Sequence, residues 1–436
     1  MAAGFLLPII LSYFFSTSSL SFTSTAIKND ERVLLFPTMA TRKTASTFLS
    51  KHNITQEESY WEVPIHGWIF QPEETSLKRR AFLSLLRKSL DLQAEEESSV
   101  ILKRRVKPFL VDNKGGKRLA VLLGEEERRT LQQRSKKNGH FKSVVKLSDE
   151  ELCGALGLTA PSSTDGGENA LSQIVKQHAK SPLKLQVRMV TSPVDTRTFT
   201  GTVHILLPHD NNSSSTTTKP TISVISDIDD TIKKSNVLQK NDLLRNTFLK
   251  EFASVPKMSS LYDHWQTKYQ VQMFHYVSSS PWQLYEELNK FLKESKFGGS
   301  ESSSTFHLKT IRLKDRSILN LLADPQQSKL ESIENIFQLY YPTSSREHSA
   351  SSSSHHQFVL VGDTGEKDPE VYGEIMRRYP QYIVAAFLRN VTGEKKEGNR
   401  LSTAFAGVGQ EKWDLFHEED EVSFKKMKNL DSWMTS

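Results

Sequence analysis

The sequence predicts an α/β protein: a doubly wound, mostly parallel sheet preceded by a smaller β-rich domain. After residue 221, short apolar runs rich in β-branched residues alternate with segments whose apolar residues recur at helical spacing. Before residue 208, strand-like runs and turns dominate, and the polar run 209–220 separates the two parts as a linker. A chain of 436 residues has room for two or three domains.

The chain begins with an apolar run, Gly4 to Phe15, which is too short to span a bilayer and suits the core of a signal peptide. Ser24 to Ala26 is a candidate cleavage site, although no Lys or Arg precedes the apolar run. Sequons that fit a secretory route begin at Asn53, Asn211, Asn212 and Asn390. Residues 1–26 therefore predict a signal peptide or apolar anchor and a secretory or endomembrane route. The alternative is a cytoplasmic protein peripheral to membranes.

Residues 27–208 are expected to form the β-rich domain, a sandwich or barrel. Residues 61–70 predict a bent strand or strand pair, and 81–92 predict an amphipathic helix. The apolar runs 106–111 and 118–123 flank a Gly-containing turn and predict a hairpin.

The charge balance is mildly basic, because 57 Lys and Arg exceed 51 Asp and Glu by six. The excess is scattered and no aromatic-rich platform accompanies it, so we expect no nucleic-acid partner. The clusters 103–105 and 134–137 are ordinarily solvated, but they are also the best candidates for contact with anionic lipid headgroups. A single cysteine, Cys153, excludes an intrachain disulfide and predicts a small core residue. The charged tail 396–436 has no Pro-x-x-Pro run, so we expect no SH3 ligand there.

The second domain, residues 221–395, supplies the candidate site. Buried strands are predicted over 222–225, 271–277, 358–361 and 382–388, and helices over 242–252, 259–265, 282–293 and 328–341. The first strand ends in Asp227, Asp229, Asp230 and Thr231. Ligands collect at the carboxyl ends of parallel strands, and acids crowded at such an edge repel one another unless a cation compensates them. The alternative is that these acids are ordinary turn formers.

The pattern Asp227-x-Asp229-x-Thr231 resembles the haloacid dehalogenase (HAD) phosphohydrolase superfamily. The longer string 227–235 resembles the catalytic domain of the App1-type phosphatidate phosphatases, as do 274–285 and 361–370. The resemblance covers roughly 222–392. It implies a HAD-like domain that hydrolyses phosphatidate, at an anionic membrane surface, to diacylglycerol and phosphate.

The same resemblance implies roles for single residues. Asp227 would be the nucleophile that forms an aspartyl-phosphate, and Asp229 the general acid and base. Ser278 would bind phosphoryl oxygens, Lys329 would neutralise charge, and Thr231 completes the catalytic set.

A Mg²⁺ ion is implied as the cofactor, held by Asp227, by Asp363 and by the backbone carbonyl of Asp229. Several positions stay open. Ser279 or Ser280 could replace Ser278, Lys314 could replace Lys329, Asp368 is either a metal ligand or a loop support, and Asp230 is a supporting residue or a helix cap.

Two other functions compete with the phosphatidate phosphatase: a HAD phosphatase for soluble or protein-borne phosphate, and a catalytically idle scaffold that docks partners at membranes. A lipid substrate predicts an apolar rim around the site, although apolar residues at helical spacing more commonly pack against a sheet. The rim candidates are Leu243, Leu244, Phe248, Phe252, Trp282 and Tyr285.

Overall fold

The computed structural model describes residues 27–49, 54–73, 77–90, 92, 96, 99–124, 127–158, 183–191, 195–207, 220–297, 303–310, 326–341 and 356–434. The predicted signal segment, most of the linker, Asn53, Asn211, Asn212 and Lys314 lie outside these residues. None of the helices that the structure describes combines the length and the apolar character needed to cross a membrane.

The amino-terminal part is built on one sheet of nine described strands, in the order β1-β3-β2-β9-β8-β5-β6, with β4 and β7 also paired to β3. The strands are β1 (Arg32–Phe36), β2 (Thr38–Leu49), β3 (Ile54–Pro72), β4 (Val111–Asn113), β5 (Ala120–Leu123), β6 (Glu127–Thr130), β7 (His140–Leu147), β8 (Leu183–Met189) and β9 (Thr200–Leu206). Strand β7 alternates buried and exposed residues, as a strand with one face on a core does. The predicted β-rich region is therefore confirmed.

The hairpin predicted over 106–123 is wrong. Val106 ends a helix, β4 pairs with β3, and β5 pairs with β6 and β8. The turn itself is present, but the amide of Gly116 donates to the carbonyl of Ser135, far along the chain. A turn signal determines the local bend of the backbone and leaves open which strand follows.

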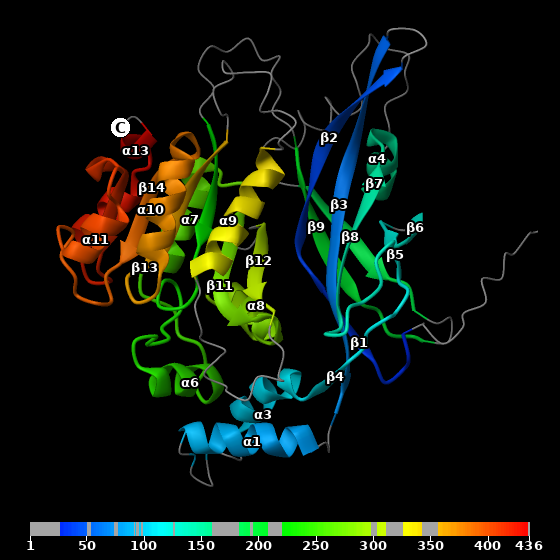
Figure 1. Cartoon of the computed structure of the whole chain (residues 1–436), viewed down its shortest axis with the longest axis horizontal. Helices are drawn as coiled ribbons and strands as arrows, with labels where there is room; N and C mark the ends of the chain where they lie inside the picture. The colour runs from blue at the N-terminus through cyan, green and yellow to red at the C-terminus, as the bar shows by residue number, and fades with distance from the viewer. Residues whose placement is uncertain are drawn as a thin grey trace, which may run out of the picture.

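Three short elements of the amino-terminal part pack on the second part instead of on their own sheet. They are α1 (Leu77–Leu90), α3 (Val100–Val106) and the 3-10 helix η1 (Lys107–Phe109). The Phe109 ring lies 5.7 Å from the ring of Phe248, and Leu86 and Leu102 belong to the same buried cluster. Figure 1 shows α1 and α3 below α6, at the bottom of the view. A fourth helix, α4 (Asp149–Ala155), begins with a capping box at Ser148 and buries Cys153.

The second part contains a six-stranded sheet in the order β12-β11-β10-β13-β14-β15, and all its described pairs are parallel. Its strands are β10 (Thr221–Ser226), β11 (Phe274–Pro281), β12 (Ser304–Lys309), β13 (His356–Asp363), β14 (Ile383–Arg389) and β15 (Trp413–Phe416). The predicted α/β architecture with a parallel sheet is confirmed.

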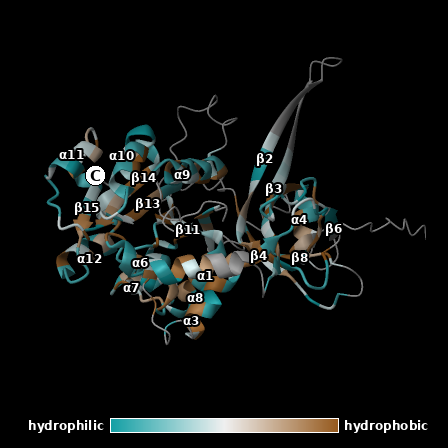
Figure 2. Cartoon of the chain, turned by 60° about the horizontal axis from the view of Figure 1, so that its bottom comes forward, coloured by the Kyte–Doolittle hydropathy of each residue, from teal (hydrophilic) through white to brown (hydrophobic). Residues whose placement is uncertain are grey.

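Helices cover both faces of this sheet (Figure 1). One face carries α7 (Met258–Tyr269), η2 (Trp282–Leu284), α8 (Tyr285–Glu294), α12 (Glu421–Lys428) and α13 (Asp431–Met434), with α6 (Lys240–Phe248) at the edge. The other carries α9 (Gln326–Tyr340), α10 (Asp368–Arg378) and α11 (Asn399–Ala404), with η5 (Pro380–Tyr382) and η6 (Gln410–Lys412) in the connections. Figure 2 shows hydrophilic residues on α9 and α10 and hydrophobic ones on β13 and β14, as expected for central strands covered on both faces.

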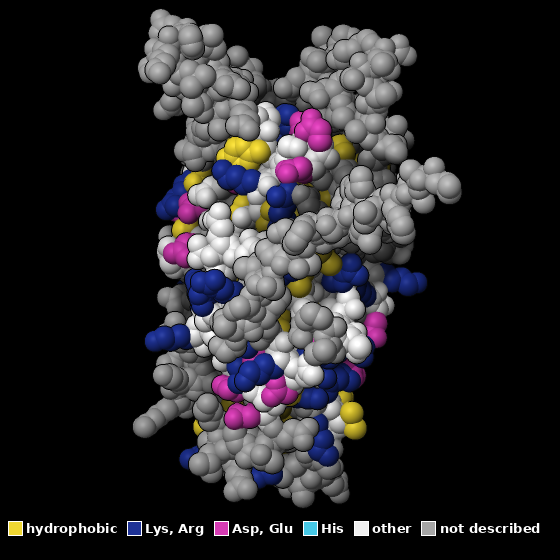
Figure 3. All heavy atoms as spheres, turned by 90° about the vertical axis from the view of Figure 1, so that its right-hand side faces the viewer, with side chains coloured by type: hydrophobic (Ala, Val, Ile, Leu, Met, Phe, Trp, Pro, Cys, Tyr) yellow, Lys and Arg dark blue, Asp and Glu magenta, His cyan; other side chains and the backbone are white. Residues whose placement is uncertain are grey.

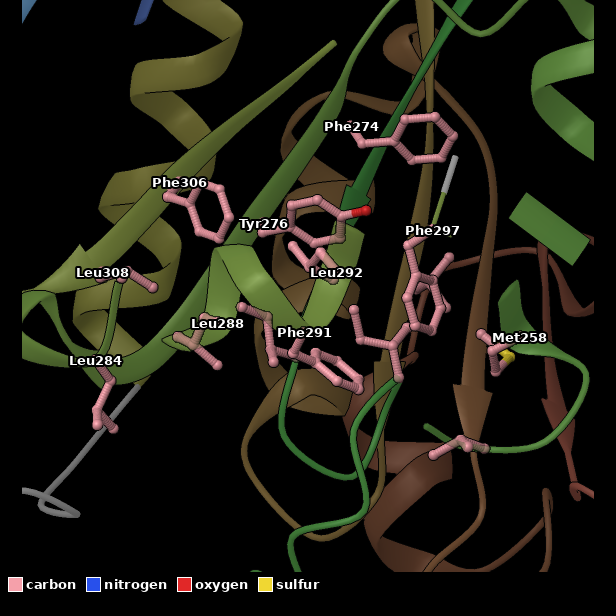
Figure 4. Packing of buried hydrophobic residues seen from close by; sticks show 14 of the residues in the cluster. Met258, Phe274, Tyr276, Leu284, Leu288, Phe291, Leu292, Phe297, Phe306 and Leu308 are labelled. Atoms are coloured by element: carbon pink, nitrogen blue, oxygen red, sulfur yellow. The ribbon is translucent and has the colours of Figure 1, made fainter. Parts of the chain in front are cut away.

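The aromatic and aliphatic residues of α8 and the neighbouring strands form a continuous core, in which Phe291, Phe306 and Tyr276 gather (Figure 4). Most residues of the predicted lipid-facing rim are buried in this core. The prediction that they line an exposed rim is therefore wrong. Leu244, Phe248, Trp282 and Tyr285 are buried in it, and Phe252 is partly buried against it. Leu243 is buried as well, outside this cluster. These apolar residues recur at helical spacing, and they pack against the sheet and the amino-terminal helices because those elements offer more apolar contact than an exposed rim.

The segment predicted as a charged tail, 396–436, contributes to the sheet and its cover. Strand β15 pairs in parallel with β14, and the indole nitrogen of Trp265 donates to the carbonyl of Met427 in α12. Charged residues separate the apolar ones here. Several of the apolar ones, Trp413 and Phe424 among them, are buried, whereas Val422 is exposed.

Candidate active site

The chain runs from β10 outward to β11 and β12, then returns to β13 on the other side of β10. Crevices form at such a reversal of strand order, at the carboxyl ends of the strands. Asp227 directly follows β10, and its amide donates to the carbonyl of Val361 in β13 at 2.8 Å. Asp363 is the last residue of β13. Both carboxylates are therefore placed by buried strands and lie inside the protein, 1% and 0% exposed.

Asp227 is held by two donors. The Thr231 hydroxyl donates to Oδ2 at 3.0 Å, and the Lys329 ammonium donates to Oδ1 at 2.9 Å. Thr231 is thus brought to Asp227 within the same loop, and Lys329 reaches it from α9. The choice of Lys329 over Lys314 is supported by this contact.

Asp229 faces a separate set of partners. Its Oδ1 lies 2.6 Å from Nζ of Lys233 and accepts a hydrogen bond from the Ser235 hydroxyl at 2.7 Å. Its Oδ2 accepts from the hydroxyls of Ser278 at 3.1 Å and Ser280 at 2.9 Å. Burial alone would raise the pKa of Asp229, but the charge of Lys233 and these hydrogen bonds bring it to about 2. Asp229 is therefore ionised at neutral pH.

Two of the three consecutive serines in β11, Ser278 to Ser280, form hydrogen bonds with Asp229 in this structure. Ser278 and Ser280 both donate to Asp229, whereas the buried hydroxyl of Ser279 has no hydrogen-bond partner among the described residues. The predicted contact of Ser278 with phosphoryl oxygens stays a prediction.

Asp230 supports the loop and touches neither Asp227 nor the metal candidates. Its carboxylate accepts hydrogen bonds from the backbone amides of Ser235, Asn236 and Val237 at 2.6 to 2.9 Å. It has a positive φ of 53°, a conformation that Asp tolerates better than most residues. The open question about Asp230 is thus answered in favour of a supporting residue.

Lys329 is the centre of an acidic cluster that sequence reasoning found only in part. Its ammonium also lies 2.6 Å from Asp368 Oδ1 and 2.8 Å from Glu366 Oε2, and it is 3% exposed. Glu366 was missed, although it lies in the same strand-end loop as Asp363. Lys233 and Ser235 were also missed, although both lie within the string 227–235 and Lys233 follows Asp229 by four residues.

Three carboxylates of this cluster are placed for a cation. Asp227, Asp363 and Asp368 each offer an oxygen, and these oxygens lie within 4.8 Å of one another. Oδ1 of Asp363 accepts from the amides of Gly365 and Glu366, but its Oδ2 is buried without a hydrogen-bond partner among the described residues. A buried carboxylate oxygen without a donor, beside two other carboxylates, fits a small hard cation.

The pKa values express the same excess of negative charge. Burial raises the pKa of Asp227 well above its usual range; Lys329 offsets this in part, and Asp368 and Glu366 raise it again. Burial raises the pKa of Asp363 too, and Asp368 adds to the effect. Burial would lower the pKa of Lys329, but Asp227 and Asp368 outweigh it and raise that pKa. One ammonium is paired with three carboxylates, Asp227, Glu366 and Asp368, and Asp363 adds a fourth negative charge nearby. A further positive charge would therefore relieve the cluster.

A pocket of about 590 Å³ opens beside the site and does not include Asp227. Its lining residues are Asp230, Asn236, Leu238, Gln239, Arg389, Asn390, Val391, His417, Glu418 and Glu419. The Arg389 guanidinium donates to the backbone carbonyl of Asp230 at 2.7 Å, so the pocket wall also holds the loop. No residue of the carboxylate cluster lines this pocket, so the chemistry of the site rests on the cluster.

The two predicted basic clusters differ in exposure. Lys103, Arg134, Lys136 and Lys137 are exposed, but Arg105 is 1% exposed, so its prediction as part of a solvated face is wrong. On the face in Figure 3, Lys and Arg side chains lie among Asp and Glu and form no single patch.

The fold and the site define an α/β domain with a buried carboxylate-rich centre at the switch point of a parallel sheet. Residues 222–390 match a family model described as the catalytic domain of phosphatidate phosphatase APP1. This region of the chain is therefore similar to the catalytic domain of the App1-type phosphatidate phosphatases.

Two curated proteins are similar to the same part of the chain. An uncharacterized protein of Schizosaccharomyces pombe is 26% identical over 174 residues, and phosphatidate phosphatase APP1 of Saccharomyces cerevisiae is 28% identical over 174 residues. The alignments cover 40% and 38% of this chain and 26% of each relative. The chain thus spans about a quarter of the length of the curated relatives it matches.

Proposed function

We propose that this protein is a Mg²⁺-dependent phosphatidate phosphatase with a HAD-like catalytic domain, which converts phosphatidate to diacylglycerol and phosphate. The observation that carries the proposal is the position of Asp227, buried at the switch point and in contact with Lys329, in a region that matches an App1 catalytic domain. The similarity to phosphatidate phosphatase APP1 of Saccharomyces cerevisiae supports phosphatidate as the substrate class.

Asp227, Asp363 and Asp368 would hold the metal. When bound, Mg²⁺ supplies positive charge that screens the repulsion between a carboxylate and a phosphate dianion. Asp368 is thereby added to the predicted ligands Asp227 and Asp363. The Asp229 side chain faces Lys233 and the serines, so only its backbone carbonyl stays a predicted ligand.

In the proposed first step, a carboxylate oxygen of Asp227 attacks phosphorus, and the bond from phosphorus to the glycerol oxygen breaks. The leaving oxygen takes a proton, and diacylglycerol departs. In the second step, water attacks the phosphorus of the aspartyl-phosphate, which restores the Asp227 carboxylate and releases phosphate. Thr231 and Lys329 keep the carboxylate oriented for attack.

Asp229 is the proposed proton carrier of both steps. In the ligand-free structure it is a carboxylate, which suits acceptance of a proton from the attacking water. A phosphate dianion next to Asp229 adds negative charge, which raises its pKa and lets it carry the proton for the leaving oxygen.

A lipid surface is the proposed location of the substrate. Two of the exposed large hydrophobic residues, Val100 at 75% and Leu238 at 56%, lie at the start of α3 and just before α6. Exposed cations on α1 and α3, Arg87, Lys88 and Lys103, add attraction to anionic headgroups of about 1 kcal/mol each.

The test is phosphate release from three substrates: long-chain phosphatidate in mixed micelles, dispersed short-chain phosphatidate and glycerol phosphate. The proposal predicts efficient release from the micelles, dependence on the surface fraction of phosphatidate, and weakening as salt screens the encounter. If the soluble esters are hydrolysed as efficiently as the micellar lipid, the protein is a general phosphomonoesterase. If none of the three is hydrolysed with Mg²⁺ present, the enzymatic proposal is overturned.

A further inference from the structure

Asp229 is held from one side by the loop that follows it. Lys233 Nζ lies 2.6 Å from Asp229 Oδ1, and Lys233 also donates to the Ser235 hydroxyl, which itself donates to Oδ1. Lys233 is 1% exposed, so its position depends on protein contacts and not on solvent.

The segment 249–255, which follows α6, holds this loop in place. The amide of Lys234 donates to the carbonyl of Ala253 at 2.8 Å, and the amide of Val255 donates to the carbonyl of Ile232 at 2.9 Å. The Lys233 ammonium also lies 4.7 Å from the ring centroid of Phe252, a favourable contact between a cation and an aromatic face.

Arg105 of α3 reaches the same segment from outside the region that matches the catalytic family model. Its guanidinium lies 3.5 Å from the ring centroid of Phe252 and donates to the carbonyls of Asn246 and Thr247, at 3.2 and 2.6 Å. These carbonyls end α6, where a cation is favoured by the helix dipole. Asn246 in turn donates through Nδ2 to the carbonyl of Ser235 at 3.0 Å.

Two acids complete the surroundings of Arg105: Glu287 Oε2 at 3.3 Å and Glu251 Oε2 at 3.4 Å. A buried charge is costly unless it is paired and hydrogen-bonded. The planar guanidinium meets carbonyls, carboxylates and an aromatic ring at once, which an ammonium cannot do. The connection from Arg105 to Asp229 is therefore a continuous set of contacts through Phe252, Asn246 and Lys233.

We propose that α3 is a working part of the catalytic site, with Arg105 as a positioning residue that keeps Lys233 against Asp229 through the segment 246–255. Together with the proposed function, on which it rests, this means that residues 222–390 alone do not hold Asp229 in its working position. The competing explanation is that Arg105 merely attaches α3 to the second part.

Arg104 provides the matched control. It lies on the same helix and contacts the same acids, Glu251 at 2.9 Å and Glu287 at 2.8 Å. The structure records no contact of Arg104 with Phe252 or with the end of α6. Arg104→Met therefore weakens the attachment of α3 without touching the connection to Asp229.

The experiment compares Arg105→Met, Arg105→Lys, Phe252→Leu and Arg104→Met in the full-length protein. We expect kcat on micellar phosphatidate to fall about 10- to 100-fold in Arg105→Met and Phe252→Leu, with little change in KM, because a displaced catalytic group costs rate more than binding. Arg105→Lys should be intermediate, and Arg104→Met should stay within about twofold of wild type.

Hydrogen exchange of peptides covering 228–238 gives a readout that needs no activity. We expect faster exchange in Arg105→Met and Phe252→Leu and wild-type exchange in Arg104→Met. If Arg105→Met does not fold, Phe252→Leu decides, because it leaves the ion pairs of Arg105 in place. Wild-type kcat and exchange in Phe252→Leu and any folded Arg105→Met would overturn the proposal, as would equal effects in Arg104→Met. An inactive wild-type protein would contradict the proposed function, and the exchange comparison would still decide this inference.

Discussion

Lys329 Nζ lies 2.9 Å from Oδ1 of Asp227, although 102 residues separate the two in the sequence. The contact joins the start of α9 to the end of β10 and is buried from solvent. It links the stability of the domain to its proposed chemistry, since the same ammonium that contacts the proposed nucleophile also offsets the repulsion among the carboxylates around it.

Replacing Lys329 should therefore affect both stability and activity. We expect Lys329→Met to lower the free energy of unfolding by about 3–5 kcal/mol at pH 7, because it leaves buried carboxylates unpaired, and to abolish turnover. The loss of stability should shrink toward pH 5, since carboxylates with raised pKa values take up protons there and the repulsion falls. Urea unfolding at the two pH values measures this. The exposed neighbour Lys367 is the control, and equal effects of Lys367→Met would contradict the account.

Metal binding can be measured without turnover. Saturating Mg²⁺ should raise the unfolding free energy of the wild type by about 2.7 kcal/mol at one hundred times Kd, because only the folded state binds it. Asp363→Asn should lose this stabilisation while the metal-free variant stays folded, since one of the repelling charges is gone. EDTA should stop phosphate release and Mg²⁺ should restore it.

The control for the metal measurement is Glu397→Gln, which changes an exposed acid that is not one of the proposed metal ligands. It should retain the full response to Mg²⁺. A wild-type protein whose stability ignores Mg²⁺, or an Asp363→Asn variant that responds fully, would exclude the proposed metal site.

Buried histidines predict a decline of stability in acid. Burial and nearby lysines lower the pKa of His140 to about 4, and burial lowers the pKa of His307 to about 4 as well. In the unfolded chain these histidine rings take up protons near pH 6.5. The stability that comes from keeping the rings neutral in the folded protein is therefore complete above about pH 6.5 and is lost as the pH falls toward 4. A pKa difference of one unit corresponds to about 1.4 kcal/mol.

Unfolding midpoints in urea between pH 7.5 and 4.5 test this. His140→Asn should flatten the pH dependence, because one of the rings that resists protonation has been removed. His417→Asn, at an exposed ring, should leave it as in wild type. The account of His140 fails if both variants show the wild-type slope.

The sequence predicted the parallel core because its strands are continuous apolar runs that end in polar residues. Strands β12 and β15 were missed, since Ser304–Lys309 has only two apolar residues and Trp413–Phe416 lies among charged residues. Both are edge strands, where burial on a single face suffices. Local sequence does not distinguish such strands from loops.

Asp227 and Asp229 were predicted from their place at a strand end, whereas Asp363 and Lys329 were predicted from the family resemblance. The structure brings Asp227, Asp363 and Lys329 together. Arg105 was placed among surface cations, because the partners that bury it lie more than 140 residues away. Burial of a charge depends on such distant partners and not on neighbouring residues.

The predicted secretory route concerns residues outside the described ones and stays a prediction. We expect the mature protein to begin near Ile27 and to carry sugar at Asn211 or Asn212. Asn390 should be unmodified, because its amide donates to the carbonyl of Glu394 at 2.7 Å and a glycan would break this loop contact. Intact-mass analysis before and after deglycosylation checks this, and an unglycosylated protein that retains Met1 or Ala2 would refute the secretory route.

The most direct measurement is phosphate release from long-chain phosphatidate in mixed micelles with Mg²⁺, by the wild type and by Asp227→Asn. We expect the wild type to release phosphate and diacylglycerol in equal amounts, and the variant to be slower by about 1000-fold or more while it keeps the wild-type circular dichroism spectrum. Loss of the attacking carboxylate removes the covalent step, and no other described carboxylate has the contacts of Asp227 with both Thr231 and Lys329. Near-wild-type turnover by a folded Asp227→Asn would contradict the central claim.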